Sequence, residues 1–308
     1  MHKVFIDGSA GTTGLKIVDR LSARSDIELI TLSEELRKDL KARKDAINSC
    51  DLAFLCLPDA AAIEAVSLIE NPAVKVVDTS TAHRVNSDWA YGFAELKGYR
   101  EKIQNSKRIA NPGCHASGFI ALVKPLIDAG VLETDAYLTS FSITGYTGGG
   151  KKMIAEYEEN KPELYLAPRQ YGLTQTHKHL PEMSAVCGLK NLPVFCPIVS
   201  DFDRGMEVTV PLFKKDIKAS IDEIKNIYKT YYTGKLVKFK DNADESGFLS
   251  SNTMKNRDDL EISVFGNEDR ILLVSRFDNL GKGASGAAIQ NMNILLGVEE
   301  TLGLNIGE

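Results

Sequence analysis

The chain has 308 residues, of which 43% are hydrophobic and 26% charged, and its formal net charge is −5. This length favours two lobes over one, and the composition is that of a globular protein with a full core. The acidic balance argues against a nucleic-acid partner, and no apolar run is long enough to cross a membrane. We expect a cytoplasmic protein, because the five cysteines have neither paired nor zinc-site spacing and no signal-peptide pattern opens the chain.

The first third of the chain alternates strand-like and helix-like segments. Short apolar runs typical of strands occur at residues 4–6, 27–32, 52–57, 74–78 and 108–111. Helical composition follows three of them, at 12–21, 34–44 and 59–68, the last with Asp59 as its expected N-cap. This alternation predicts an α/β fold with a parallel sheet and helices on both faces, a Rossmann-type lobe.

A glycine-rich segment, Gly8-Ser9-Ala10-Gly11-Thr12-Thr13-Gly14, follows the first expected strand and opens the first helix. Its spacing differs from the usual dinucleotide fingerprint, but glycines still allow close backbone approach and helix N–H groups still face a pyrophosphate. We interpret the segment as a dinucleotide cradle. The alternative is a tight turn that binds nothing.

The tip of the second expected strand bears on the choice of dinucleotide. Ser33, Arg37 and Lys38 suit the 2′-phosphate of NADP, whereas Glu34 or Glu35 suits the ribose hydroxyls of NAD. We favour NADP.

Another polar segment, Asp78–Arg84, follows the strand expected at 74–78 and carries Ser80 close to the expected cofactor site. The guanidinium of Arg84 can clamp a phosphate or a carboxylate, although a surface salt bridge is the simpler reading.

Residues 111–118 read Asn-Pro-Gly-Cys-His-Ala-Ser-Gly, and they deliver Cys114 to the start of an apolar helical pattern. The unpaired N–H groups and the positive dipole at a helix N-terminus favour a thiolate, which is the nucleophilic form of cysteine. A small buried hydrophobic residue is the alternative reading of Cys114. The other cysteines, at 50, 56, 187 and 196, are interpreted as core or near-core thiols.

Beyond this helix the pattern changes to that of an α+β lobe with a mostly antiparallel sheet, suited to covering an active site and forming a dimer surface. Strands are expected at 136–145, 194–199, 207–213, 261–265 and 271–276. Helices are expected at 217–231 and 287–296, together with a polar helix that opens at Gly148-Gly149-Gly150.

Two histidines, His177 and His179, precede Glu182 in the second lobe. They suit either a metal site or a base that activates Cys114, with Glu182 orienting an imidazole. Because no further His or Cys is well placed, the Cys–His pairing is the simpler interpretation, although surface histidines at a helix start remain an alternative. A glycine-rich turn at 278–284 offers Asn279 and loop amides to a nicotinamide amide or a phosphate, unless it is a plain turn.

Together these segments resemble the N-acetyl-γ-glutamyl-phosphate reductase family, in its shorter subtype, over nearly the whole chain. The resemblance rests on Gly8–Gly14, Asp78–Arg84, Asn111–Cys114, Gly145–Gly150, His177–Glu182 and Asp278–Ala284. The related aspartate-semialdehyde dehydrogenases share the architecture and the last of these turns, but they usually carry Asn where Gly113 stands. His115 is a departure, because an aromatic residue is commoner after the cysteine.

The resemblance implies an oxidoreductase of arginine biosynthesis that acts on a small acyl phosphate with NADP(H) and no metal, as a homodimer or homotetramer. Residues 1–113, with the C-terminal helix of 284–308, would form the NADP-binding lobe, and residues 114–283 the catalytic and dimerisation lobe. Cys114 would form a thioester, and His179 or His177 would move the proton, with His179 favoured. An aspartyl-phosphate reductase and an NADP-binding sensor without chemistry are the alternatives.

The resemblance also assigns contacts residue by residue. The implied cofactor contacts are Gly8, Ser9, Gly11, Thr12, Thr13, Gly14, Ser33, Arg37, Ser80, Gly149 and Asn279. The implied substrate contacts are Arg84, Asn111, Ser117 and Glu182.

Overall fold

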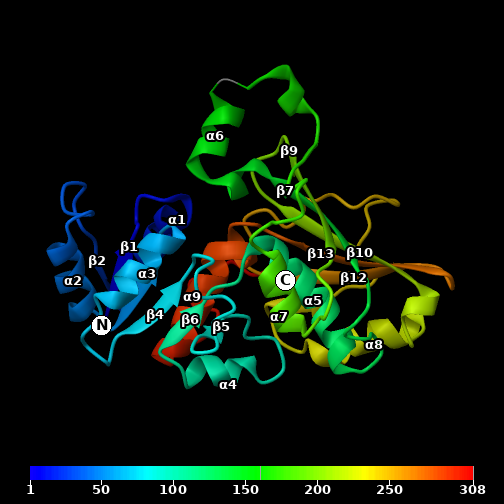
Figure 1. The fold of residues 1–308 in the computed structure, drawn as a ribbon, viewed down its shortest axis with the longest axis horizontal. Helices are drawn as coiled ribbons and strands as arrows, with labels where there is room; N and C mark the ends of the chain where they lie inside the picture. The colour runs from blue at the N-terminus through cyan, green and yellow to red at the C-terminus, as the bar shows by residue number, and fades with distance from the viewer. Residues whose placement is uncertain (160, 308) are drawn as a thin grey trace. The chain divides into compact units, whose positions relative to one another are not determined.

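The computed structural model describes residues 1–159 and 161–307 and divides the chain into two compact units (Figure 1). Unit 1 comprises residues 1–94, 98–112 and 284–304. Unit 2 comprises residues 95–97, 113–283 and the chain from Asn305 on. Among the described residues, no helix combines the length and the apolar character that crossing a membrane requires.

Unit 1 is built on a six-stranded sheet in the order β2-β1-β3-β4-β6-β5, and every neighbouring pair in it is parallel. The predicted parallel sheet is therefore confirmed. Its strands are β1 (His2–Asp7), β2 (Ile27–Ile30), β3 (Leu52–Leu55), β4 (Lys75–Asp78), β5 (Ala90–Tyr91) and β6 (Arg108–Ala110). The third of them is buried along its whole length, as its unbroken apolar sequence predicts for a strand covered on both faces.

Helices cover both faces of this sheet, because alternate strand side chains point to opposite faces. On one face Val4 and Ile6 pack with α1 and α9, and on the other Phe5 packs with α2 and α3. The helices of this unit are α1 (Thr12–Leu21), α2 (Leu40–Ser49), α3 (Asp59–Ser67), α4 (Tyr99–Gln104) and α9 (Gly286–Leu296).

One expected helix start and one expected N-cap in unit 1 are wrong. The helix expected at 34–44 begins only at Leu40, because the Asp39 side chain accepts the N–H of Ala42 and caps it there. The N-cap of α3 is Pro58 rather than Asp59, whose carboxylate instead accepts hydrogen bonds from the backbone and hydroxyl of Thr81.

Unit 2 contains a seven-stranded sheet in the order β11-β12-β13-β10-β7-β9-β8. The pairs β11–β12 and β7–β9 are parallel and the others are antiparallel, so the expectation of a mostly antiparallel sheet is confirmed. Its strands are β7 (Thr139–Gly145), β8 (Arg169–Gln170), β9 (Val194–Ser200), β10 (Met206–Phe213), β11 (Val237–Phe239), β12 (Leu260–Gly266) and β13 (Arg270–Phe277).

The helix α5 (Cys114–Asp128) packs on one face of this sheet through a small residue. A Cβ added at Gly118 would lie 2.4 Å from the Val208 side chain and 2.8 Å from Ser275 Oγ, so only glycine allows this approach. The other helices are α6 (Gly150–Glu158), α7 (Leu180–Cys187) and α8 (Ile221–Tyr231), and the short turns are η1 (Tyr146–Gly149), η2 (Glu163–Leu166), η3 (Lys214–Asp216) and η4 (Gly281–Ser285).

The predicted start of α8 at Ile217 is also wrong. Ser220 accepts the N–H of Glu223, and Glu223 accepts the N–H of Ser220 in return, so this capping box begins the helix at Ile221. The helix α6 opens at the glycines 148–150 as expected and lies beyond the end of β7, apart from α5, α7 and α8 (Figure 1).

Candidate active site

Cys114 is the first residue of α5, as the sequence predicts. The N-cap residue, Gly113, is extended and has no side chain to bond the first N–H groups of the helix. Those amides and the positive end of the helix dipole therefore favour negative charge at this end of α5. A thiol placed there is suited to act as a nucleophile.

The other cysteines provide the contrast. Burial raises the pKa of the Cys50 thiol to about 11 and that of Cys56 to about 12, and it raises the pKa of Cys187 as well. These thiols are protonated at neutral pH and cannot compete as nucleophiles. Cys196, on β9, is partly exposed.

Glu182 connects α7 to the start of α5. Its side chain is 1% exposed, and its Oε2 atom accepts the N–H of Gly113 at 3.2 Å. The other oxygen, Oε1, lies 3.9 Å from Nε2 of His179. Glu182 thus places a carboxylate beside both the helix that carries Cys114 and one of the two expected catalytic histidines.

Of the two histidines, His179 is buried in unit 2 and His177 is partly exposed. His179 is the N-cap residue of α7 and is only 5% exposed, so the surface reading is wrong for it. Its backbone N–H donates to Nδ1 of His177 at 3.2 Å, and the two rings are 4.8 Å apart. A neutral His177 therefore carries its proton on Nε2, because Nδ1 accepts a hydrogen bond.

A third histidine, His115, joins this pair, and sequence reasoning gave it no role. Its ring centroid lies 5.7 Å from that of His177 and 5.5 Å from that of His179. Its Nδ1 lies 2.6 Å from Ser142 Oγ and its Nε2 lies 2.6 Å from the hydroxyl of Tyr171. Burial, and then the charge of His177, lowers the pKa of His115 to about 3.

This cluster resembles a metal site only superficially. Both ring nitrogens of His115 are engaged by hydroxyl groups, and within the described part of the chain no group of three or more His, Cys, Asp or Glu side chains is arranged to hold a metal ion. The partner of His115, Ser142, lies with Ser140 and Thr144 on the buried face of β7, and no sequence pattern links it to His115.

The turn at 278–283 lies against the nucleophile. A Cβ added at Gly283 would be 3.0 Å from Cβ of Cys114. The amide of Asn279 donates to Thr147 Oγ1 at 3.1 Å and accepts the N–H of Gly205 at 2.9 Å. These two bonds join η1 to the residue that precedes β10, inside unit 2.

Two other expected contacts in unit 2 are also placed by local packing. Ser117 is buried, and its hydroxyl donates to the carbonyl of Gly113 at 3.1 Å. Gly149 is exposed at the end of η1, and a Cβ there would lie 2.4 Å from the Met153 sulfur. Ser117 thus stabilises the first turns of α5, and Gly149 allows the close approach of Met153 at the start of α6.

The glycine-rich loop of unit 1 has the geometry of a phosphate cradle. Gly8 has a φ of +86°, and a Cβ on it would lie 2.3 Å from the Cys56 carbonyl oxygen. A Cβ on Gly14 would lie 2.4 Å from the Gly8 oxygen, so this close approach also needs glycine. Gly11 caps α1 without a side-chain bond, which leaves the N–H groups from Thr12 on for an anion.

A cavity of about 350 Å³ opens beside this loop. Its lining includes Gly8, Ser9 and Gly11 of the loop, together with Arg37 and Lys38. These cationic side chains and the bare helix start fit the phosphates of a dinucleotide.

After β2, the residues that favour NADP and those that favour NAD lie differently with respect to this cavity. The Ser33 carbonyl accepts the N–H of Arg37, forming the turn that carries the arginine. Ser33, Glu34 and Glu35 are not among the residues that line the cavity, and Glu34 pairs with Arg37 at 2.8 Å. Arg37 and Lys38 thus line the cavity, and the acidic residues Glu34 and Glu35 are not part of its lining.

The polar residues after β4 bond to one another within unit 1. The Ser80 hydroxyl donates to Asp78 at 2.7 Å, and Nδ1 of His83 lies 2.6 Å from the same carboxylate oxygen. Arg84 donates from Nε to the carbonyl of Asn111 and from Nη2 to that of Thr79. The guanidinium thus holds the ends of β4 and β6 and makes more than a surface salt bridge.

Asn111, which follows β6, is 1% exposed. Its amide donates to the carbonyl of Ala284 at 3.0 Å and accepts from the Asn291 side chain at 3.1 Å. These bonds tie the end of β6 to the start of α9.

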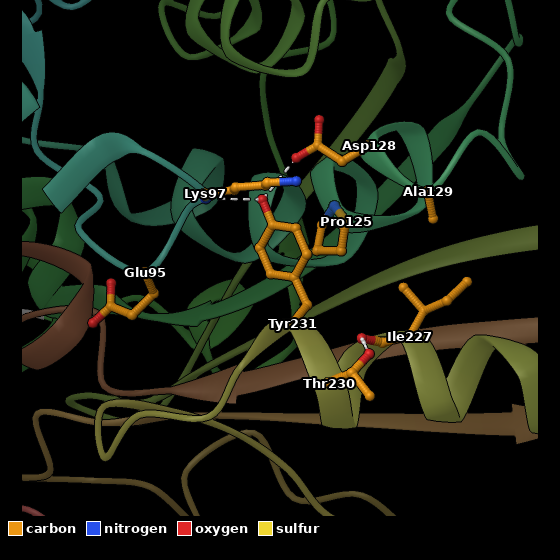
Figure 2. A pocket seen from close by; sticks show the side chains of 8 residues that line it. All are labelled: Glu95, Lys97, Pro125, Asp128, Ala129, Ile227, Thr230 and Tyr231. Carbon is orange, nitrogen blue, oxygen red and sulfur yellow. Dashed lines mark hydrogen bonds between the residues drawn. The ribbon is translucent and has the colours of Figure 1, made fainter. Parts of the chain in front are cut away.

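A second cavity, of about 430 Å³, lies in unit 2 beside α5 and α8 (Figure 2). Tyr231 lines this cavity, and its hydroxyl donates to Asp128 at 2.7 Å and accepts the N–H of Lys97 at 3.1 Å. Its lining contains none of the candidate site residues, so it is separate from the cluster around Cys114.

Comparison with known proteins gives two family matches. Residues 3–106 match the NAD binding domain of semialdehyde dehydrogenase, and residues 114–279 match the dimerisation domain of semialdehyde dehydrogenase. N-acetyl-gamma-glutamyl-phosphate reductase 2 of Nostoc sp. is 44% identical, over 98% of this chain and 99% of that protein. The N-acetyl-gamma-glutamyl-phosphate reductase of Brucella ovis is 45% identical, over 96% of this chain and 99% of that protein.

Solved structures share the fold at much lower identity. The aspartate semialdehyde dehydrogenase II of Vibrio cholerae, complexed with ASA, has a TM-score of 0.73 at 16% identity, over 96% of this chain and 98% of that one. The aspartate semialdehyde dehydrogenase of Candida albicans, solved with NADP, has a TM-score of 0.69 at 14% identity, with the same coverage. At such identities the likeness concerns the fold alone.

Proposed function

The chain belongs to the N-acetyl-γ-glutamyl-phosphate reductase family, and from this premise we propose that it reduces N-acetylglutamyl 5-phosphate to N-acetylglutamate 5-semialdehyde with NADPH. This reaction is a step of arginine biosynthesis. The observation that carries the proposal is the position of Cys114 at the first residue of α5, in the same unit as His177, His179 and Glu182. That arrangement joins an activated sulfur to groups that can move a proton.

The reaction proceeds through a thioester on Cys114. The thiolate attacks the acyl carbon, the bond from that carbon to the phosphate oxygen breaks, and phosphate leaves. NADPH, when bound, supplies the hydride that turns the thioester into a thiohemiacetal. The thiohemiacetal oxygen gains a proton and then loses it as the carbon–sulfur bond breaks, releasing the aldehyde and restoring the thiolate.

His179 is the proposed acid–base residue. Its ring lies beside the Glu182 carboxylate, which favours an imidazole that gains a proton during the reaction. Nδ1 of His177 accepts the backbone N–H of His179, so Nε2 of His177 is a donor suited to a substrate oxygen.

The proposed cofactor is NADP(H), held by unit 1 as the dinucleotide-binding lobe. The cradle of Gly8, Ser9 and Gly11, with the amides of residues 12–14, suits the pyrophosphate. Arg37 and Lys38 line the same cavity and suit a 2′-phosphate. We propose structural roles for the other four expected cofactor contacts. Ser33 and Ser80 hydrogen-bond within the NADP-binding lobe, and Gly149 and Asn279 shape loops of the catalytic lobe.

Arg84 is the proposed anchor for a substrate anion, phosphate or carboxylate, because it presents a guanidinium at the ends of β4 and β6. Asn111 and Ser117 are proposed to support the segment that carries Cys114. Before Cys114, the Asn111 amide donates to the carbonyl of Ala284; after it, the Ser117 hydroxyl donates to the carbonyl of Gly113.

We also propose that the chain works as a homo-oligomer in the cytoplasm, as a homodimer or homotetramer. The match to a dimerisation domain supports an oligomer. So does the face of the unit 2 sheet opposite α5, where the strands β7, β9 and β13 expose Phe141, Val194 and Leu272. A second copy covering this face would bury apolar surface that one chain leaves in water.

The test is the reverse reaction, followed as NADP⁺ reduction in the presence of phosphate. We expect activity with N-acetylglutamate semialdehyde, little with aspartate semialdehyde, and lower activity with NAD⁺ than with NADP⁺. Cys114→Ser should abolish turnover without changing the unfolding midpoint. A preference for aspartate semialdehyde would instead assign the chain to aspartyl phosphate, and absence of both activities would leave a nucleotide-binding sensor.

A further inference from the structure

A buried carboxylate lies at the end of β1, where the glycine-rich loop begins. Asp7 is the last residue of that strand and directly precedes Gly8, and it is only 3% exposed. It also lines the cavity of about 350 Å³ that opens beside the loop. An aspartate is rarely buried unless its charge is paired, so the partners of both carboxylate oxygens matter.

One oxygen of Asp7 is held by a single arginine. Its Oδ2 atom lies 3.0 Å from both Nε and Nη2 of Arg43, which donate to it from α2. Arg43 is itself 6% exposed, and its Nη1 lies 2.6 Å from Oε2 of Glu64 on α3. The guanidinium therefore fixes the position of the Asp7 carboxylate and balances its charge.

The other oxygen of Asp7, Oδ1, is left for the cavity. No side chain of the described residues donates a hydrogen bond to it, because Arg43 donates to Oδ2 alone. The charge of the carboxylate is thus balanced while one of its two oxygens keeps its capacity to accept. An ionised carboxylate can only accept hydrogen bonds, so a partner in the cavity has to be a donor.

The rest of the cavity lining suits a nucleoside. Leu32, Leu57 and Pro58 supply apolar surface for a flat base. Arg37 and Lys38 supply the cations proposed above for a 2′-phosphate. Ligand pockets span roughly 300–1,000 Å³, so a cavity at the lower end of this range suits one nucleoside rather than a whole dinucleotide.

The order of the strands sets which part of that nucleoside lies nearest to Asp7. β1 pairs with β2 on one side and with β3 on the other, and neighbouring strands lie about 4.8 Å apart. The cations follow β2, whereas the cradle for the pyrophosphate follows β1. A ribose with its 2′-phosphate at the cations and its 5′ side at the cradle bridges these two strand ends, and its 3′ carbon lies between them. Asp7 ends β1 at this place.

The 3′-hydroxyl is the donor that such a ribose offers. In NADP(H) the 2′ oxygen of the adenosine ribose is esterified and the ring oxygen carries no hydrogen. The amine of adenine is the other donor of the nucleoside, but it lies at the edge of the base away from the ribose. Rossmann-type proteins commonly bind ribose hydroxyls with an acidic residue after the second strand. Here Glu34 and Glu35 are not part of the lining, and among the described residues Asp7 is the acidic side chain that is.

We propose that Asp7 is a further cofactor-binding residue, whose Oδ1 accepts a hydrogen bond from the 3′-hydroxyl of the adenosine ribose of NADP(H). This inference rests on the proposed function, because it requires NADP(H) in this cavity. It also explains how a carboxylate is tolerated next to a site for phosphates, since Arg43 balances its charge and the ligand hydroxyl takes its remaining oxygen.

A purely structural ion pair would show the same contacts. Arg43 joins β1 to α2 through Asp7 and joins α2 to α3 through Glu64, so loss of Asp7 could weaken any ligand that needs an intact cavity. The two roles differ in one respect: only a direct contact distinguishes ligands with and without the 3′-hydroxyl.

The experiment measures by calorimetry the dissociation constants of NADP⁺ and of its 3′-deoxyadenosine analogue, which lacks that hydroxyl alone. The parent protein is compared with the double variant Asp7→Ala, Arg43→Met, because removing both partners of a buried ion pair leaves no uncompensated charge between them. The matched control is Glu64→Gln, which removes the other partner of Arg43 and leaves Asp7 in place. Both ligands carry the same phosphates, so a change of charge in the protein cancels in the ratio of their affinities.

We expect the parent to bind the 3′-deoxy analogue about tenfold more weakly than NADP⁺, because a hydrogen bond to a charged acceptor is lost. In the double variant the two ligands should bind within twofold of each other. Glu64→Gln should keep the tenfold difference. Replacing the adenine of NADP⁺ by hypoxanthine removes the amine instead, and this change should alter the affinity of the parent less than threefold.

Three results overturn the inference while the proposed function stands: a parent that binds both ligands equally tightly, a double variant that keeps the tenfold difference, or a Glu64→Gln variant that loses it. A loss of affinity with the hypoxanthine analogue alone would place the adenine amine at Asp7 and would also overturn it. A parent that does not bind NADP⁺ overturns the proposed cofactor, and this inference with it. The comparison of ligands on the parent needs no variant, so it stays decisive even if the double variant fails to fold.

Discussion

Substituting Gly283 by alanine adds one methyl group directly against the nucleophile. The new Cβ would lie 3.0 Å from Cβ of Cys114, 3.1 Å from the carbonyl oxygen of Asp278 and 3.2 Å from the ring of Phe277. Ordinary contacts of a Cβ are longer by a few tenths of an ångström, so at least one neighbour must move. None of the three is the free end of a flexible side chain, so the turn that carries Gly283 and the start of α5 that carries Cys114 must move apart.

The size of the effect follows from that displacement. Overpacking of this kind costs about 1–3 kcal/mol of the free energy of unfolding. A displacement of 1 Å at a reacting group can reduce the rate by about 100-fold, so a few tenths of an ångström at Cys114 should lower kcat by about tenfold or less. We expect Gly283→Ala to lose both stability and kcat, with KM little changed.

The measurements are kcat from NADPH oxidation and the free energy of unfolding from urea titration. Gly234→Ala is the matched control in the same unit, because a Cβ there meets no atom within 4 Å. If Gly283→Ala keeps kcat within twofold of the parent and unfolds at the same urea concentration, the turn does not pack against Cys114 as described.

Further predictions concern the cofactor, pH and assembly. Arg37→Ala should raise KM for NADPH about tenfold and leave KM for NADH within twofold, since only NADPH carries the phosphate that the guanidinium suits; equal changes would refute this role. His115 has a pKa of 6.5 when unfolded and about 3 when folded, so the unfolded state binds the extra proton between these values. As pH falls from 6.5 towards 3, this residue should remove roughly 1 kcal/mol of unfolding free energy per pH unit. In urea titrations, the unfolding free energy of His115→Gln should fall less steeply with decreasing pH than that of the parent protein. Equal pH dependence in the two proteins would contradict the prediction. Phe141→Glu should dissociate the oligomer in light-scattering measurements, whereas an unchanged mass would place the interface elsewhere.

The part of the site that sequence predicts best is the part made by neighbours along the chain. The Pro-Gly turn before an apolar helical pattern placed Cys114 at the first residue of α5, and the glycine spacing placed a bare helix start after β1. Both depend on local backbone rules. The capping box of Ser220 and Glu223 was equally readable, and applying it would have corrected the start of α8.

The chain of His115, Ser142 and Tyr171 could not be predicted, because its partners are 27 and 56 residues away from His115 in sequence. Only the packing of α5 on β7 and the path of the segment after β8 bring them together. Asn279 is a second case: its residue type predicts a cofactor contact, and the structure adds two partners within unit 2, Gly205 and Thr147, that lie far from it in sequence.

The most direct measurement is to trap the acyl group on the protein. The enzyme is mixed with N-acetylglutamyl phosphate without NADPH, quenched in acid and digested, and its peptides are examined by mass spectrometry. We predict an N-acetylglutamyl group on the peptide that contains Cys114, which disappears when NADPH is added before the quench. Acylation of another cysteine, or release of phosphate with no acylated peptide, would contradict the proposal that Cys114 is the nucleophile.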